Sequence, residues 1–312
     1  MKVLVLGGYG AVGAAVVSEL RGYGETAIVA GRDPARAELA VDVRDPRSYR
    51  AALDGVDVVV NASGVEDPAL VGIAAGQGVA FVDVTASTDY VGAVERLTPR
   101  APVLLSVGLA PGVTNLLAMA VPATEREREV EIAIVLGAKD AHGVAATEWS
   151  YRLLGRRFAD PVSDAPVRNY TRGRRFDLPG LGRRRLYRTD FSDQHTLTRE
   201  LGVPVRTYFG LDSRLGTTAL ALLTWLPGAR RLPRHAPLPG GDGWLLLARG
   251  SGGATRWLRG RRQSEGTGVV TAIAARRAVT LDPGVHHLHH VLTLDDLVLD
   301  GALRRAPGSA PR

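Results

Sequence analysis

The chain has 312 residues, of which 45% are hydrophobic and 23% charged, and it contains no cysteine. These values are typical of a globular protein, and they exclude structural disulfides, thiolate metal sites and wholesale disorder. The net charge of +7 comes almost entirely from arginine. We expect its two arginine clusters, at 172–188 and 230–234, to lie in solvated loops rather than on a nucleic-acid interface.

The apolar segments are too short or too broken to serve as membrane or export signals. Glycines interrupt the apolar run at the N-terminus. The longest later run, Leu215–Trp225, is about half the roughly 20 residues that a bilayer requires. Together with the absence of cysteine, this predicts a cytoplasmic protein without membrane or nucleic-acid partners. We expect a homodimer that acts on a small-molecule substrate.

Strands and helices alternate from the first residue to about residue 120. Strands are expected at 2–6, 26–30, 56–61, 80–84 and 102–107, and helices at 11–20, 46–53, 68–76 and 90–97. Each strand is apolar on both faces, which is typical of a parallel sheet covered by helices on both sides. The fold class predicted is therefore α/β, a Rossmann doubly wound parallel sheet.

The pattern changes after residue 122. Residues 130–136 alternate as a strand, and helices are expected at 216–225 and 268–278 among loops rich in glycine and proline. We predict a Rossmann domain over 1–122 that is rejoined by 266–303. An inserted α+β domain over 123–265 would serve substrate binding or dimerisation, and 304–312 would form a flexible tail.

A glycine-rich fingerprint follows the first strand and opens the first helix. It reads Gly8-Tyr9-Gly10-Ala11-Val12-Gly13. In a dinucleotide site the first glycine permits the tight turn, the second lets the backbone approach the pyrophosphate, and the third lets helix and strand pack closely. The N–H groups of the helix N-terminus would face the phosphates. All six residues are predicted to bind cofactor.

The end of the second strand indicates which nucleotide binds. An NAD site places an acid there, whereas an NADP site offers an arginine. Here the strand ends in Ala30-Gly31-Arg32, so Gly31 would leave room for a 2′-phosphate and Arg32 would pair with it. We interpret Asp33 as a helix N-cap ahead of Pro34 rather than as the acid of an NAD site. The cofactor predicted is NADP(H).

The ends of later strands should line the same crevice, because ligands of such sheets bind at the carboxyl ends of the strands. Asp42 and Val43 would lie near the adenine. Small residues after the next strand would admit the nicotinamide ribose: these are Asn61, Ala62, Ser63 and Gly64. Thr85 follows the strand after that and completes the predicted cofactor set.

Several motifs resemble the saccharopine dehydrogenase/reductase-like family, in its actinobacterial form. They are VLVLGGYGAVG at the start, AGRD at 30–33, VVVNASG at 58–64, FVDVTAS at 81–87, GLAPGVTNLLA at 108–118, HGVAATEW at 142–149, DFSDQHTL at 190–197, LDSRLGTT at 211–218, GTGVVTA at 266–272 and PGVHHLHH at 283–290. The resemblance implies a Rossmann domain with a second, mixed domain. It also implies nicotinamide-linked chemistry on amino-acid-like C–N bonds, and a structural role for the GVHHL segment.

Proton transfer needs a residue that the first domain does not offer. The Tyr-x-x-x-Lys pair of short-chain dehydrogenases is excluded, because Val135 stands four residues before Lys139. The densest polar cluster comprises Tyr187, Asp190, Asp193, Gln194 and His195. His195 would donate the proton and Asp193 would tune it. Alternatively, Ser192 and Asp193 simply cap a helix.

His142 and Glu148 form the second catalytic candidate, although an alanine-rich helix with one buried tryptophan explains that segment nearly as well. The histidines His286, His287, His289 and His290 lack a nearby carboxylate until Asp295, and we predict no metal site there. The function predicted is an NADP(H)-dependent oxidoreductase acting on a small amino-acid-like substrate. A non-catalytic NADP-binding sensor or scaffold, and a redox-neutral isomerase or lyase with bound nicotinamide, stay open as alternatives.

Overall fold

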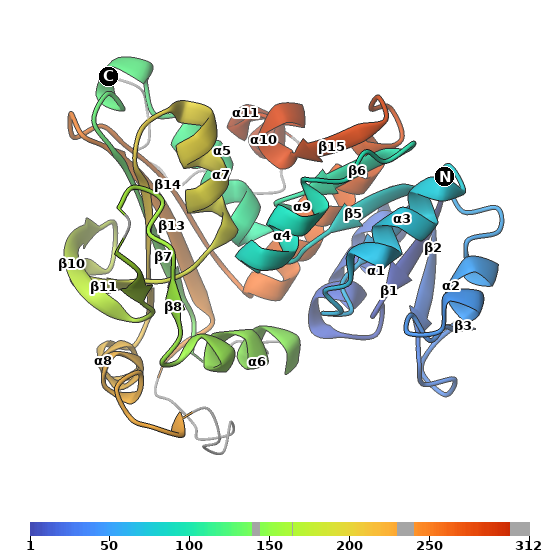
Figure 1. Ribbon diagram of the computed structural model, residues 1–312, viewed down its shortest axis with the longest axis horizontal. Helices are drawn as coiled ribbons and strands as arrows, with labels where there is room; N and C mark the ends of the chain where they lie inside the picture. The colour runs from blue at the N-terminus through green and yellow to red at the C-terminus, as the bar shows by residue number, and fades with distance from the viewer. Residues whose placement is uncertain (139–143, 164, 230–239, 300–312) are drawn as a thin grey trace. The chain divides into compact units, whose positions relative to one another are not determined.

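The computed structural model describes residues 1–138, 144–163, 165–229 and 240–299 (Figure 1). The chain divides into two compact units. The first combines Met1–Gly112 with Ser264–Leu292, and the second combines Val113–Gln263 with Thr293–Arg312. The sequence placed the corresponding boundaries at 122/123 and 265/266. The substrate or dimerisation role expected for the second unit stays a prediction.

The first unit is built on a seven-stranded sheet in the order β15-β6-β5-β4-β1-β2-β3. Its strands are β1 (Lys2–Leu6), β2 (Thr26–Gly31), β3 (Leu39–Ala40), β4 (Val58–Asn61), β5 (Ala80–Asp83), β6 (Pro102–Leu105) and β15 (Gly284–His287). Every neighbouring pair in it is parallel. The predicted doubly wound Rossmann sheet is confirmed.

Helices connect these strands. They are α1 (Ala11–Gly22), α2 (Pro46–Ala52), α3 (Pro68–Gly76), α4 (Thr88–Val94), α9 (Gln263–Ala278) and α10 (Leu288–Val291). The side chains of Asp45 and Asp67 cap α2 and α3, each ahead of a proline at the first helical position. A side chain at Gly268 of α9 would collide with Ala15 of α1, so these two helices pack closely.

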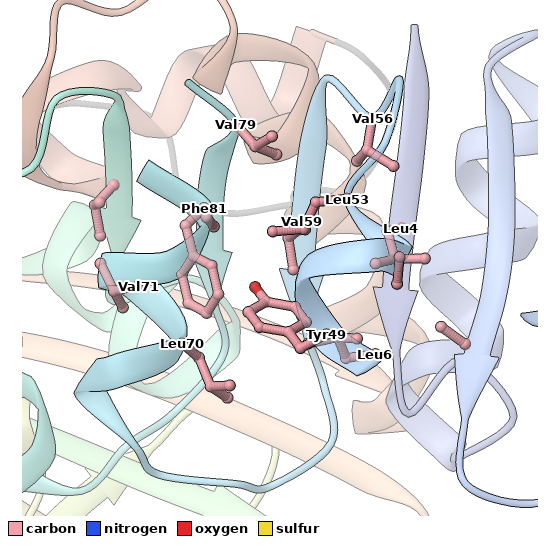
Figure 2. Close-up of a cluster of buried hydrophobic side chains, with 14 of the residues drawn as sticks. Leu4, Leu6, Tyr49, Leu53, Val56, Val59, Leu70, Val71, Val79 and Phe81 are labelled. Atoms are coloured by element: carbon pink, nitrogen blue, oxygen red, sulfur yellow. The ribbon is translucent and has the colours of Figure 1, made fainter. Parts of the chain in front are cut away.

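The core of the first unit lies between its sheet and helices (Figure 2). Figure 2 shows Leu4 and Val59 from the strands together with Tyr49 from α2 and Leu70 from α3, and all four are buried. The side chains in this cluster are almost entirely apolar. The exceptions are two tyrosine hydroxyls: that of Tyr90 donates to Asp83, whereas that of Tyr49 is buried and has no hydrogen-bond partner among the described residues.

The second unit is built on a mixed six-stranded sheet in the order β10-β11-β12-β7-β13-β14. Its strands are β7 (Val130–Leu136), β10 (Thr171–Leu178), β11 (Gly182–Arg188), β12 (Val205–Leu211), β13 (Gly243–Gly250) and β14 (Thr255–Arg261), with a small separate pair, β8 (Arg157–Phe158) and β9 (Val167–Arg168). Only the β12–β7 pairing in the larger sheet, as described, is parallel. Its helices are α5 (Thr114–Met119), α6 (Val144–Leu153), α7 (Ser192–Leu201), α8 (Arg214–Leu223) and α11 (Leu294–Leu299).

This second sheet curls on itself. Arg174 in β10 lies 2.5 Å from Glu131 in β7, although two strands separate β10 from β7. The turn after β10 also meets the opposite edge of the sheet, since a side chain at Gly180 would touch the guanidinium of Arg259 in β14. The curl encloses a second core that includes Phe176.

The strands decide one of the two expectations about arginine clusters. Residues 172–188 are not solvated loops, because they form most of β10 and β11, and Arg188 is fully buried. The arginines at 230–234 lie outside the described residues. Within the described part of the chain, no helix is both long and apolar enough to cross a bilayer.

Candidate functional site

The turn between β1 and α1 has the geometry of an anion-binding loop. Gly7 has a φ of +73°, and a side chain on it would press against the Ala62 carbonyl. A side chain at Gly13 would collide with the Gly7 carbonyl, which confirms that the last glycine permits close packing of helix and turn. Apart from its chain neighbours and its own helix, a Cβ added at Gly10 has one atom of the described residues within 4 Å, the Gly7 carbonyl oxygen at 3.1 Å, so the outer side of the turn is open.

The N-terminus of α1 is suited to a phosphate. Gly10 is the N-cap and supplies no side-chain cap, and the first helical turn carries no acidic residue. The N–H groups that begin α1, at Ala11 and Val12, therefore keep the partial positive charge of the helix end. The glycine turn fits a pyrophosphate on these grounds. The residue with left-handed backbone at this turn is Gly7, whereas the tight turn was predicted at Gly8. The adjacent pair Gly7-Gly8 is the sequence signal that could have identified it.

The end of β2 differs from the expectation. A side chain at Gly31 would collide with the ring of Tyr9, so Gly31 makes room for that ring and not for a 2′-phosphate. The Tyr9 hydroxyl accepts a hydrogen bond from the backbone N–H of Asp33 at 3.3 Å. The guanidinium of Arg36 lies 4.3 Å from the centre of the Tyr9 ring and donates to the Tyr9 carbonyl at 3.1 Å. Sequence reasoning missed Arg36, because its contact with Tyr9 bridges 27 residues.

The segment after Gly31 is a turn and not a helix start. Asp33 Oδ1 accepts from the Ala35 N–H at 3.0 Å and closes this turn, which corrects the predicted N-cap of a helix. Arg32 is exposed and has no side-chain hydrogen bond or ion pair within the described residues. Asp42 is also exposed, and its Oδ1 accepts from the Arg44 N–H. Val43 instead packs against the core.

A buried hydrogen-bond network joins the ends of β4 and β5. Asp83 Oδ2 accepts from Asn61 Nδ2 at 2.9 Å and from the Tyr90 hydroxyl at 2.7 Å. Its other oxygen accepts from the Thr85 N–H at 2.7 Å. Burial raises the pKa of Asp83 although these donors oppose the shift. The network fixes both strand ends from inside the protein.

The same network limits what each predicted residue can contact. Asn61 is buried, and its amide nitrogen bonds Asp83 while its oxygen accepts from the Ser63 hydroxyl at 2.7 Å. Asn61 therefore positions the loop, and its predicted contact with cofactor stays a prediction. Gly64 has a φ of +74° and is exposed. Ala62 and Ser63 lie against Gly7, so the glycine turn and the β4 loop meet at one edge of the sheet.

A second polar group joins β6 to β15, and the sequence did not predict it. His287 Nδ1 lies 2.9 Å from the Ser106 hydroxyl, and Nε2 lies 3.1 Å from Glu95. The backbone N–H of His290 also donates to the His287 side chain. Because Glu95 engages Nε2, the Nδ1 atom must accept, and Ser106 donates to it. Ser106 and His287 are buried, so the arrangement holds these two strands together.

In the second unit, His195 forms an acid–base pair with Asp190 and not with Asp193. His195 Nε2 lies 2.9 Å from Asp190 Oδ1, and both side chains are partly exposed. In neutral histidine the carboxylate fixes the proton on Nε2 and leaves the lone pair on Nδ1. The ring edge of His195 also faces Phe158, with 6.3 Å between ring centres.

Asp193 is fully buried in α7. Its Oδ1 accepts from Thr207 at 2.7 Å and its Oδ2 from Thr114 at 2.9 Å. Burial raises its pKa against these hydrogen bonds. The predicted tuning of His195 by Asp193 is therefore replaced by a structural role that ties α7 to β12 and α5. The alternative of an N-cap is also wrong, since Phe191 is the N-cap and Asp193 lies inside the helix.

A buried arginine lies beside this pair. Arg188 Nη1 donates to Asp160 at 3.1 Å, and Nη2 donates to the Gln194 amide oxygen at 3.0 Å. The Phe158 ring lies 5.4 Å from the guanidinium. Burial lowers the pKa of Arg188, although the nearby Asp160 carboxylate opposes this shift. The residues that sequence reasoning grouped at 187–195 thus separate into a structural set and the pair His195–Asp190.

The second pair of catalytic candidates falls outside the part of the chain whose side chains are described. His142 lies outside the described residues. Glu148 belongs to α6, and its side chain lies outside the described part of the structure. The adjacent Trp149 packs its ring against Phe191, with 4.7 Å between ring centres.

Comparisons with known proteins agree with this architecture. Residues 3–106, a third of the chain, match the model of the NAD dependent epimerase/dehydratase family. No curated protein sequence matches the chain. Apo saccharopine dehydrogenase (L-Glu forming) from Saccharomyces cerevisiae is similar over 97% of this chain and 98% of its own, with a TM-score of 0.62 and 13% identity. DAP dehydrogenase from C. glutamicum, in complex with DAP, covers 96% and 98%, with a TM-score of 0.50 and 14% identity.

At these identities the likeness is one of fold. The chain has the two-part fold of saccharopine dehydrogenase, and the resemblance that its motifs indicated is confirmed at that level. Its first unit has the Rossmann fold that binds pyridine nucleotides.

Proposed function

We propose that this chain is an NADP(H)-dependent oxidoreductase of the saccharopine dehydrogenase/reductase-like family. It transfers hydride at a C–N or C=O centre of a small amino-acid-like substrate. The observation that carries the proposal is the open glycine turn at the uncapped N-terminus of α1, in a chain that shares the fold of saccharopine dehydrogenase along nearly its whole length. Bound NADPH would supply the hydride.

The chain's own residues bind and orient this cofactor in the proposal. The pyrophosphate lies on the N–H groups after Gly10, where no side chain obstructs it. The network around Asp83 holds the loops at Ser63 and Thr85 in place on the neighbouring strands. The ribose phosphate end lies by Arg32 and Arg36, which flank Tyr9 and the end of β2.

Calorimetry with NADPH and NADH tests the cofactor. We expect NADPH to bind more tightly, because its 2′-phosphate pairs with the two exposed arginines. Arg32→Ala and Arg36→Ala should each narrow the gap by about 1–3 kcal/mol, the contribution of a charged hydrogen bond. Arg100→Ala is the matched control, since Arg100 is exposed and precedes β6, which lies four strands from β2 in the sheet.

Two outcomes would contradict the cofactor proposal. Equal affinities of the unmodified protein for NADPH and NADH would remove the case for NADP. Unchanged affinity in a folded Gly10→Val variant would remove the case for this turn, because the valine branches into the space that the pyrophosphate requires.

We further propose that His195 transfers the proton that accompanies hydride transfer, with Asp190 holding its tautomer. Turnover would be measured as the rate of NADPH oxidation in the presence of a 2-oxo acid and an amine. His195→Ala should lower turnover by about 10²–10⁴, the usual contribution of a general acid or base, and leave NADPH affinity unchanged. Asp190→Asn should shift the pH profile of turnover, which a purely structural role would not do. His286→Ala, a partly buried histidine of the first unit, is the control.

The result that decides this point is the turnover of His195→Ala. If it equals that of the His286→Ala control, His195 is not the proton donor. Absence of NADPH oxidation with every oxo acid and amine tried would favour the non-catalytic alternative, provided that NADPH binds.

A further inference from the structure

One side of α8 exposes a row of large apolar side chains. Leu215 is 73% exposed, Leu222 64%, Trp225 61% and Leu226 58%. Their spacing of seven, then three or four residues, places them along one side of the helix and its extension. The opposite side packs on the unit through Leu220. Thr218 stands between Leu215 and Leu222 on this side, but four large exposed apolar side chains in one row are uncommon on a globular surface and mark a place of interaction.

Arginines border this row at its N-terminal end. Arg214, the first residue of α8, donates to the Arg183 carbonyl of β11 at 3.2 Å. Arg184 of β11 lies close to Arg214, whose positive charge adds to burial in lowering the pKa of Arg184.

The other end of the row also carries an arginine. The guanidinium of Arg168 lies 4.8 Å from the centre of the Trp225 ring and donates to the Thr224 carbonyl at 3.3 Å. Asp212, just before α8, accepts from the N–H groups of Ala138 and Gly241, and its single negative charge faces the two positive charges of Arg184 and Arg214. The apolar row is therefore bordered by positive charge at both ends.

We propose that this surface, the α8 row with its bordering arginines, binds the surface of an anionic lipid bilayer. Leucine and tryptophan side chains would enter the boundary between headgroups and acyl chains, and the arginines would meet the anionic headgroups. The association is peripheral, because none of the described helices could cross the bilayer. The expectation of no membrane partner rested on the lack of spanning segments, which does not bear on a peripheral surface.

Two other occupants fit less well. A second copy on the same surface would bring two equal sets of positive charge into one interface, and like charges repel. A nucleic acid would neutralise the arginines but would leave Leu222 and Trp225 without apolar partners. An anionic lipid surface satisfies both halves of the pattern.

Vesicle flotation of the full chain tests the proposal. The protein should float with vesicles of phosphatidylcholine and phosphatidylglycerol, and much less with phosphatidylcholine alone. The bound fraction should fall as NaCl is raised. Leu222→Glu and Trp225→Glu should each weaken binding at least about tenfold. Val279→Glu is the matched control, because Val279 is 44% exposed in the first unit.

Replacing Arg214 with Ala should weaken binding roughly fivefold, and Arg100→Ala should not. Trp fluorescence of the unmodified protein gives a readout that needs no variant, since burial of Trp225 in the bilayer should shift its emission to the blue. Absence of flotation on anionic vesicles overturns the proposal. So does a lipid-free dimer, seen by analytical ultracentrifugation, that Leu222→Glu converts to a monomer.

Discussion

The two units bury different kinds of side chain. The core of the first is apolar, with polar groups such as Asn61 and Asp83 gathered at the strand ends. The second unit encloses charge: Arg188 is 2% exposed and Glu131 3%. Removal of one partner of a buried ion pair leaves an uncompensated buried charge, which costs about 3–5 kcal/mol. The stability of the second unit should therefore depend more on single polar side chains than that of the first.

Arg188→Met should lower the stability of the second unit more than any other substitution proposed below. The change leaves the Asp160 carboxylate without its buried partner, although the more exposed Arg172 lies 3.7 Å from it. We expect a loss of about 3–5 kcal/mol in the free energy of unfolding, measured by denaturant titration. Arg185→Met is the control on the same strand, because Arg185 is exposed. Equal losses in the two variants would contradict the contrast, and adding Asp160→Leu to Arg188→Met should restore part of the stability.

The buried carboxylate of the second unit should also appear in the pH dependence of stability. Burial raises the pKa of Asp193, so the folded protein takes up this proton more readily than the unfolded chain. The resulting stabilisation is present at low pH and is lost as the pH rises through the raised pKa. Relative to Asp193→Asn, the unmodified protein should lose up to about 1.4 kcal/mol per pH unit over that range. Unfolding free energies measured from acid to neutral pH check this, and a constant difference between the two proteins would contradict it.

Tyr49→Phe should have the smallest effect, and of the opposite sign. The Tyr49 hydroxyl is buried in the first core without a partner (Figure 2), so removing it should stabilise the protein by about 1 kcal/mol. Tyr90→Phe is the comparison, because its hydroxyl donates to Asp83 at 2.7 Å and its loss should destabilise. Thermal unfolding of both variants shows the signs. If Tyr49→Phe instead lowers the stability, the core of the first unit depends on this polar group, and the contrast between the two units is wrong at that point.

The contrast also explains how far sequence reasoning reached. Strands such as 2–6 are apolar on both faces, and the glycines of the first turn are local signals, so both could be predicted. In 171–188, Arg188 is buried and Arg185 is exposed although both are arginines, so residue type alone does not show which side chain lies in a core. The strands in this segment were therefore mistaken for loops. What decides between them is burial by distant segments.

The prediction of the candidate site was wrong for the same reason, wherever a contact joins residues that the sequence pattern does not relate. Asp193 and His195 are two positions apart on α7, and residues with that spacing do not face each other on a helix. The partner of His195 is Asp190, which precedes the helix. Gly31 was taken as space for a phosphate, but Tyr9, more than twenty residues earlier, fills that space.

The chain order of the first unit has a consequence for synthesis on the ribosome. Its sheet begins with β1 but gains its last strand, β15, only after the segment 113–263 of the second unit has been made. Helix α9, which packs on α1, emerges equally late. Until then the exposed edge of β6 and one side of α1 lack their covers. The nascent first unit therefore exposes the β6 edge and this side of α1 to chaperones while the intervening segment is translated.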